Sequence, residues 1–208
     1  SSTDPEVWRA ELNLDDRPVI VVGSTRGEEE ESFVLEALEG LVGRVQVIHA
    51  PRHLERAEAL ASAAKARFGG VARRSEGQTG DYVILDTYGE LDGVYSVADL
   101  AIVGGGFANH GGQNLIQPLA HGVPVLHGPH MQNFAEAAKQ AADAGCARVC
   151  TTPEELHSAL EHLLSHPDER AQMSGAARQM ISASLGASKR YAQVILSEAE
   201  RALSERKK

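Results

Sequence analysis

Short runs of branched aliphatic residues alternate with segments of helical length along most of this chain. Such runs suit strands that are buried on both faces, as in a parallel sheet. The segments between them are long enough to cross back over the sheet as helices. The sequence therefore predicts an α/β fold with a doubly wound, mostly parallel sheet, in one domain over residues 1–208. We expect strands at residues 19–22, 45–48, 71–73, 82–85, 100–103, 123–126 and 147–150, and helices at residues 28–38, 54–68, 90–97, 113–121 and 133–144.

The C-terminal part of the sequence predicts additional helices without strands. Thr152 and Pro153 form a helix start, because proline is favoured at the first helical position behind a hydroxyl cap. The dipeptide His166-Pro167 breaks the helical pattern, and a last charged helix is expected at residues 188–204.

Composition excludes several classes of protein. Aromatic residues make up only 4% of the chain, so the core is built from small aliphatic side chains, as in a parallel sheet covered by helices. The net charge of −9 argues against a nucleic-acid partner, which usually meets a basic face. No apolar run approaches the roughly 20 residues that span a bilayer. Cys146 and Cys150 lack partners for a zinc site or a disulfide scaffold, which predicts a reduced, cytoplasmic protein.

The loops that follow the expected strands contain most of the unusual polar residues and glycines. In an open parallel sheet, ligands bind beyond the carboxyl ends of the strands, near the point where strand order reverses. The sequence thus predicts a small-molecule cleft at one edge of the sheet. It would be formed by residues 23–25, 51–53, 86–90, 104–106 and 127–130.

The segment from Gly104 to Gly112 has five glycines in nine positions. Glycines let a backbone approach a ligand closely, and N–H groups ahead of a helix suit an anionic phosphate. The segment is neither a Walker A loop nor a G-x-G-x-x-G fingerprint in the first βα turn. A loop that binds no ligand is the alternative interpretation.

Four further side chains are candidates for binding a nucleotide. Arg52 follows a strand and Pro51, so that its guanidinium could hold a phosphate or stack on a base; the alternative is a surface arginine paired with an acid. Glu90 could line the cleft or simply favour a helix start. Asn114 and Gln117 are three residues apart, on one face of the expected helix, and could meet ribose hydroxyls or remain solvated.

Metal and hydrolase chemistry have little support in the sequence. His121, His127 and His130 lie close together but have no carboxylate at ligand spacing, so we expect no metal site. There is no Gly-x-Ser-x-Gly nucleophile elbow, and no Cys/His pair stands in a nucleophilic arrangement.

Several motifs, in order, resemble the 3-deoxy-D-manno-octulosonic acid (Kdo) transferases. The resemblance covers roughly residues 18–136 and is more specific than any single glycine-rich loop. The matching segments are Gly-Ser-Thr at 23–25, Ala-Pro-Arg-His-Leu-Glu-Arg at 50–56, Asp-Thr-Tyr-Gly-Glu-Leu at 86–91, the run from Tyr95 to Gly105, Gly-Gly-Gln-Asn-Leu-Ile-Gln-Pro at 111–118, Gly-Val-Pro-Val-Leu-His-Gly-Pro-His at 122–130 and Asn-Phe at 133–134.

This resemblance implies a C-terminal, Rossmann-like half of a GT-B glycosyltransferase. Such a half binds CMP-Kdo, while an N-terminal half, expected to be absent from this chain, binds the lipid A precursor and supplies the catalytic base. It implies no cofactor, no metal and no catalytic residue in this domain. The residues expected to bind the nucleotide sugar are Ser24, Pro51, Arg52, His53, Gly89, Glu90, Leu91, Gly105, Gly106, Gly111, Gly112, Asn114 and Gln117.

Two departures from the family pattern affect the expected donor. The family usually has histidine at the position of Gln113 and glutamate at that of Gln117. Glutamine lacks the charge with which a carboxylate accepts ribose hydroxyls, so donor identity and affinity depart from the family expectation. Two alternative functions therefore stay open: a nucleotide-binding module without turnover, and a sugar-nucleotide epimerase-type enzyme. The expected partners are a nucleotide sugar, the acceptor-binding half and its lipid, at the cytoplasmic face of an inner membrane.

Overall fold

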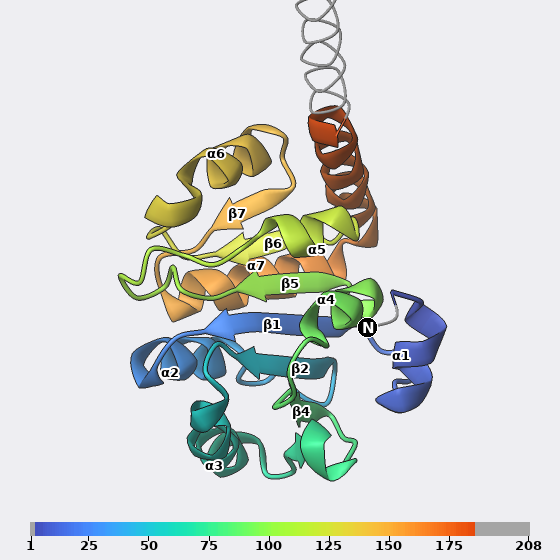
Figure 1. The fold of residues 1–208 in the computed structure, drawn as a ribbon, viewed down its shortest axis with the longest axis vertical. Helices are drawn as coiled ribbons and strands as arrows, with labels where there is room; N and C mark the ends of the chain where they lie inside the picture. The colour runs from blue at the N-terminus through green and yellow to red at the C-terminus, as the bar shows by residue number, and fades with distance from the viewer. Residues whose placement is uncertain (1–2, 186–208) are drawn as a thin grey trace, which may run out of the picture.

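A computed structural model describes residues 3–185, and its centre is a sheet of seven strands that all run in the same direction (Figure 1). Every strand pairing is parallel, and the strand order is β3-β4-β2-β1-β5-β6-β7. The strands are β1 (Val19–Thr25), β2 (Gln46–Pro51), β3 (Ala72–Arg73), β4 (Tyr82–Ile84), β5 (Leu100–Val103), β6 (Val125–His127) and β7 (Ala147–Val149). The predicted α/β fold with a doubly wound parallel sheet is confirmed.

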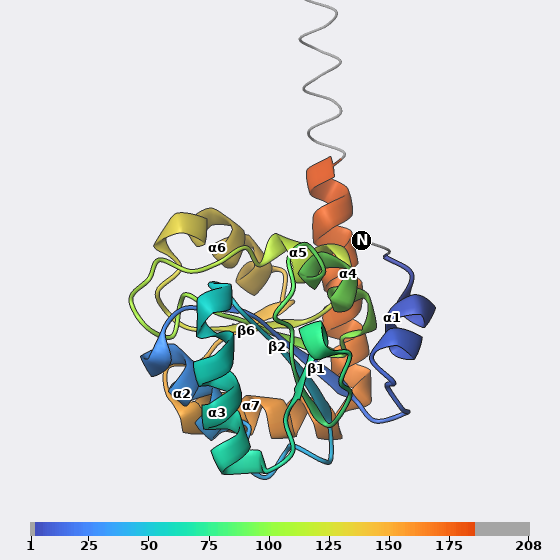
Figure 2. The same cartoon turned by 60° about the horizontal axis from the view of Figure 1, so that its bottom comes forward.

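Helices cover both faces of the sheet, and they form two groups in Figure 2. On one face lie α1 (Pro5–Glu11), α4 (Leu91–Val94), α5 (Ile116–Ala120), α6 (Ala135–Asp143) and a helix over residues 167–185. On the other face lie α2 (Glu28–Ala37), α3 (Ala57–Phe68) and α7 (Pro153–Ser165). Short 3-10 turns are η1 (Leu54–Arg56), η2 (Arg74–Glu76), η3 (Tyr95–Val97) and η4 (Gln132–Phe134).

Strand side chains alternate between two separate cores. Val19 and Val21 of β1 pack into the core under α4 and α5, while Ile20 and Val22 pack into the core under α2 and α7. This period of two is the geometry of an extended strand buried on both faces. The sequence accordingly has branched aliphatic residues at all four positions from Val19 to Val22.

Some helix boundaries differ from the sequence prediction. The N-terminal helix α1 was not predicted, and its Trp8 is buried under the sheet. The helix expected at residues 113–121 begins only at Ile116. The predicted start at Thr152 and Pro153 is confirmed, because the Thr152 hydroxyl accepts a hydrogen bond from the Glu155 amide. The helix predicted at residues 188–204 lies outside the described residues.

A buried histidine links three strands. The Nε2 atom of His49 on β2 lies 2.8 Å from the Thr25 hydroxyl, and its Nδ1 atom lies 2.6 Å from the Tyr82 hydroxyl. All three side chains are fully buried. Burial lowers the pKa of His49 to about 3 from an ordinary value of 6.5, so that the imidazole is neutral in the folded chain at neutral pH.

This burial predicts acid sensitivity. As pH falls below 6.5, His49 becomes protonated in the unfolded chain, whereas in the folded chain it stays neutral down to about pH 3. The free energy of unfolding therefore drops through this window, by up to about 1.4 kcal/mol per pH unit, and is unaffected above it. When pH is lowered from 7 to 4.5, the free energy of unfolding, measured with urea, should fall by about 2 kcal/mol less in His49→Gln than in the parent chain. The exposed His110→Gln is the control; an equal loss in all three proteins would contradict the prediction.

Candidate nucleotide site at the carboxyl edge of the sheet

The loops after β1, β2, β5 and β6 meet at one edge of the sheet, on the left in Figure 1. The strand order reverses between β1 and β5, because β1 continues to β2 on one side and has β5 on the other. The Gly104 amide donates to the Gly23 carbonyl over 2.8 Å, and the Arg52 amide donates to the Thr25 carbonyl over 2.9 Å. The prediction that these loops share one edge is confirmed. This edge holds the switch point at which doubly wound sheets bind ligands.

We expected the amides of the glycine-rich loop to face a ligand, but two of them are bonded to a side chain of the chain itself. Glu30, in the first turn of α2, is fully buried, and its carboxylate accepts three backbone N–H groups. They are the amides of Arg26 at 2.6 Å, Gly105 at 2.7 Å and Phe107 at 3.0 Å. A carboxylate of the chain itself therefore occupies two amides of the predicted phosphate loop. Any phosphate at this edge has to be held by other groups.

Close loop packing is a further reason for the glycines. A Cβ atom on Gly128, after β6, would lie 2.1 Å from the carbonyl oxygen of Gly106 and 2.3 Å from the amide nitrogen of Phe107. A Cβ atom on Gly104 would lie 2.6 Å from the Ser24 carbonyl oxygen. Real Cβ contacts are never that short, so the loops after β1, β5 and β6 touch backbone to backbone. Close packing of these loops is thus a reason for Gly104 and Gly128 that does not depend on a ligand.

Two unpaired arginines lie at the ends of β1 and β2. Most arginines in residues 3–185 pair with a carboxylate, but the guanidinium groups of Arg26 and Arg52 have no hydrogen-bond or ion-pair partner there. The alternative interpretation of Arg52, in which it pairs with a nearby acid, is therefore wrong for the described chain. Unpaired guanidinium groups in a chain of net charge −9 are suited to bind an anionic ligand. Arg26 was missed; its place directly after β1 was the available signal.

Glu90, another candidate, is held by neighbouring side chains. Arg74 donates to both of its carboxylate oxygens at 3.1 Å, and the Thr87 hydroxyl also donates to it. Arg74 in turn pairs with Glu11 and lies 5.6 Å over the Trp8 ring. Burial acts to raise the pKa of Glu90, but the hydrogen bonds from Arg74 and Thr87 outweigh it and keep the pKa below its ordinary value. Glu90 is thus an ionised anchor between the loop after β4 and α1.

The late start of α5 changes the geometry of Asn114 and Gln117. We expected both on one helical face, but Asn114 lies in the loop, exposed, and its side-chain oxygen accepts the Ile116 amide at 3.0 Å. This bond between residues i and i+2 forms an Asx turn just ahead of α5, whose N-cap residue is Leu115. Gln117 is in the first turn of α5 and half-buried. The shared-face prediction is therefore wrong, because the asparagine ends the loop instead of continuing the helix.

The remaining candidates lie around the same loops. Ser24 has a left-handed φ of 62° at a bulge in β1, and Leu91 begins α4 behind Gly89. His53 is exposed after Pro51, the buried last residue of β2. Gly111 and Gly112 have φ values of 85° and 83°, and Gly112 donates its amide to Gly105. Gly112 thus lies against the loop after β5, while contact of all these residues with a ligand stays a prediction.

The histidines considered for a metal lie apart. His121 ends α5, whereas His127 ends β6 at the other edge of the sheet. Within residues 3–185 no group of three or more His, Cys, Asp or Glu side chains is placed to hold a metal ion. In the same range, no helix has both the length and the apolar character needed to cross a bilayer. Cys146 and Cys150 are both free and buried.

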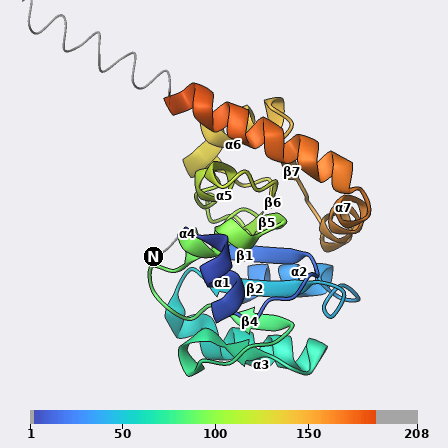
Figure 3. The ribbon, with the colours of Figure 1, turned by 90° about the vertical axis from the view of Figure 1, so that its right-hand side faces the viewer.

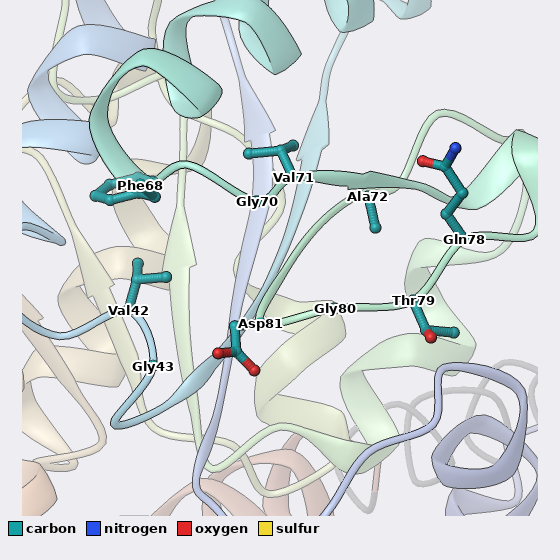
Figure 4. A pocket seen from close by; sticks show the side chains of 10 residues that line it. All are labelled: Val42, Gly43, Phe68, Gly70, Val71, Ala72, Gln78, Thr79, Gly80 and Asp81. Atoms are coloured by element: carbon teal, nitrogen blue, oxygen red, sulfur yellow. The ribbon is translucent and has the colours of Figure 1, made fainter.

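A cavity of about 420 Å³ lies away from this site (Figure 4). Its lining includes Val42, Phe68, Val71 and Asp81, which belong to segments that precede β2, β3 and β4. It therefore opens at the amino ends of these strands, the edge opposite to the switch point. We do not assign the nucleotide site to it.

Comparison with solved structures identifies the class of domain. The C-terminal CMP-Kdo binding domain of WaaA from Acinetobacter baumannii superposes with a TM-score of 0.78 at 24% identity, over 85% of this chain and 95% of that one. The C-terminal domain of the glycosyl transferase group 1 family protein LpcC from Francisella tularensis gives a TM-score of 0.58 at 10% identity, over 88% and 93%. The fold is that of the C-terminal, Rossmann-like half of a GT-B glycosyltransferase.

Sequence comparison finds homologues that share one name. The chain is 42% identical over 185 residues to the 3-deoxy-D-manno-octulosonic acid transferase of Bordetella pertussis. The aligned segment covers 84% of this chain and 43% of the relative. It is 36% identical over 171 residues to the enzyme of the same name from Chlamydophila psittaci, 80% of this chain and 39% of the relative. No protein-family model matches. The chain is a homologue of the Kdo transferases and spans less than half the length of these relatives.

Proposed function

We propose that this chain is the donor-binding domain of a glycosyltransferase that moves Kdo from CMP-Kdo to a lipid A precursor. The observation that carries the proposal is the meeting of Arg26, Arg52 and the glycine-rich loop at the switch point, in a chain homologous to Kdo transferases. No cofactor or metal takes part in it. The relatives are named as transferases, which supports transfer over an epimerase-type reaction or binding without turnover.

In this proposal the chain binds the donor and stabilises the departing phosphate. Arg52 holds the phosphate of the nucleotide, because a guanidinium presents paired donors to phosphate oxygens. Arg26 adds a second positive charge on the neighbouring loop. The charge on the phosphate grows as the glycosidic bond breaks, so these two cations stabilise the transition state more than the ground state. Gln117 takes the position expected for ribose contacts.

The acceptor, the catalytic base and the cellular location belong to the whole protein and are part of the proposal. An N-terminal acceptor-binding domain faces the carboxyl edge of this sheet, binds the lipid and supplies the carboxylate base. The transfer takes place at the cytoplasmic face of the inner membrane, where the full-length enzyme is peripheral or anchored. The names of the relatives and the matching C-terminal domain from A. baumannii support this arrangement.

Calorimetric titration with CMP tests the donor, with UDP, GDP and ADP as controls. Selective binding of CMP is the expected result. Preference for another nucleotide would replace the donor and leave the fold assignment intact. If none binds to this chain, the assay is repeated with the full-length enzyme and CMP-Kdo, and a failure there rejects the proposal.

Within that titration, Arg52→Ala should weaken CMP binding about 10- to 100-fold, because a charge-assisted contact to phosphate is lost. The free energy of unfolding should stay unchanged, since the Arg52 side chain is exposed and unpaired in the described chain. Arg44→Ala is the matched control: this exposed arginine precedes β2 and pairs with Glu161. Equal CMP affinity in the two variants would remove Arg52 from the site.

A further inference from the structure

A cavity of about 300 Å³ lies at the amino ends of β5 and β6, between these strands and the helix over residues 167–185. In Figure 3 this edge of the sheet is turned toward the viewer. The segments that precede the two strands contribute Ser96, Asp99 and Gly122, and the helix contributes Arg170, Ser174 and Arg178. The cavity is therefore separate from the switch point, which lies at the carboxyl ends of the same strands.

Two arginines of the helix reach this cavity. Positions 170, 174 and 178 are four residues apart and so share one helical face. The guanidinium of Arg178 has no hydrogen-bond or ion-pair partner within residues 3–185. It packs directly on Gly122, where a Cβ atom would lie 2.6 Å from its Nε atom. The glycine thus leaves room for a cation that no acid of the described chain neutralises.

Arg170 is fixed by the end of the preceding helix. Its Nη1 atom donates to the carbonyl oxygens of Leu163 at 2.7 Å and Leu164 at 3.0 Å, which are among the last carbonyls of α7. These bonds hold the side chain in place at the cavity wall. A fixed guanidinium loses little conformational entropy when its remaining N–H groups bind a ligand.

The helix also brings a hydroxyl-bearing residue to the cavity. Ser174 is half-buried and lines the cavity between Arg170 and Arg178. The Ser96 Oγ atom, by contrast, is buried beneath the cavity wall and is closed off from the cavity.

The acidic groups nearby are already engaged. The Asp99 carboxylate accepts the Val19 amide at 2.9 Å. His121, which also lines the cavity, lies 3.5 Å from Asp92. The cavity thus has two arginines against one lining carboxylate, in a chain whose net charge is −9. This local excess of positive charge favours an anion.

We propose that this cavity is a second binding site, for the phosphate group of a small phosphate monoester. Arg178 and Arg170 bind the phosphate oxygens. The volume of about 300 Å³ exceeds that of bare phosphate, so an attached small organic group fits as well. The phosphate belongs to a soluble metabolite or to a phosphomonoester lipid headgroup, which present the same chemistry to the cavity.

Inorganic phosphate, titrated in chloride buffer and followed by NMR, tests the site. The amide signals of Ser96 and Gly122 should shift and saturate below about 10 mM phosphate. Arg178→Gln should weaken this binding about 10-fold or more. Arg52→Gln is the matched control, because it removes an unpaired arginine from the opposite edge and should leave these shifts intact. No saturable shift, or equal affinity in Arg178→Gln, would overturn the proposal.

Glycerol 3-phosphate and vesicles containing phosphatidic acid distinguish the two sources of the phosphate. Competition by only one of them identifies the source; competition by neither, with phosphate bound, would reject the monoester assignment.

Discussion

Replacing Glu30 with alanine should lower the free energy of unfolding by about 3 to 5 kcal/mol. Its carboxylate accepts three backbone N–H groups from the loops after β1 and β5. A buried N–H group without an acceptor costs about 1 to 3 kcal/mol, and alanine leaves all three in that state. Urea unfolding at pH 7 measures the effect.

Two other variants make the Glu30 prediction specific. Glu29→Ala removes an exposed neighbour in the same helical turn and should change stability by less than about 0.5 kcal/mol. Glu30→Gln retains one acceptor oxygen but turns an amide nitrogen toward an N–H group, so its stability should fall between those of alanine and the parent chain. Equal stability of Glu29→Ala and Glu30→Ala would show that the carboxylate does not hold the loops.

Gly128→Ala should destabilise the chain by at least about 3 kcal/mol, because the added methyl group meets backbone that has no room to move aside. The nearest atoms would be the carbonyl oxygen of Gly106 at 2.1 Å and its carbonyl carbon at 2.2 Å. The loops after β5 and β6 must separate, so we also expect weaker CMP binding. Thermal unfolding and the calorimetric titration described above measure the two effects.

The control for Gly128 is Gly175→Ala, a substitution in the helix over residues 167–185. A Cβ atom at Gly175 would have no neighbour within 4 Å. Alanine favours a helix over glycine, so this variant should be equal or more stable by about 0.5 to 1 kcal/mol. A small effect at Gly128, similar in size to that at Gly175, would contradict the close packing of the two loops.

The sheet was predictable because its signal is local. Each strand is a run of branched residues, and each strand end carries glycine or polar residues, so the shared edge followed from parallel strand direction. The capped start at Thr152 was equally local. The helix α1 was missed because Pro5–Glu11 is only two turns long and buries only Trp8, which is too little for a helical period of apolar residues.

The roles of individual site residues depended on tertiary contacts. The four consecutive glutamates of α2 predict an acidic helix start, whose charge favours the helix N-terminus. The structure shows in addition that Glu30 and Glu31 are buried. A signal was present, since they precede the buried Val34 and Leu35 by one helical turn and share their face. What no pattern shows is the partner: Glu30 meets a loop more than 70 residues away, and Glu31 pairs with Arg56.

The pairing of β1 with β5 has a consequence for how the chain folds as it is synthesised. Ile20 lies opposite Leu100, and the Val19 amide donates to Asp99 across 80 residues of sequence. Until the ribosome has released that later segment, β1 has a partner on one edge only, and its other edge exposes free hydrogen-bonding groups. Closure of such a long loop is slow. The β1–β5 pairing at the centre of the sheet therefore forms after the β1–β2 and β2–β4 pairings, and a nascent chain interrupted before Leu100 exposes a strand edge prone to aggregation.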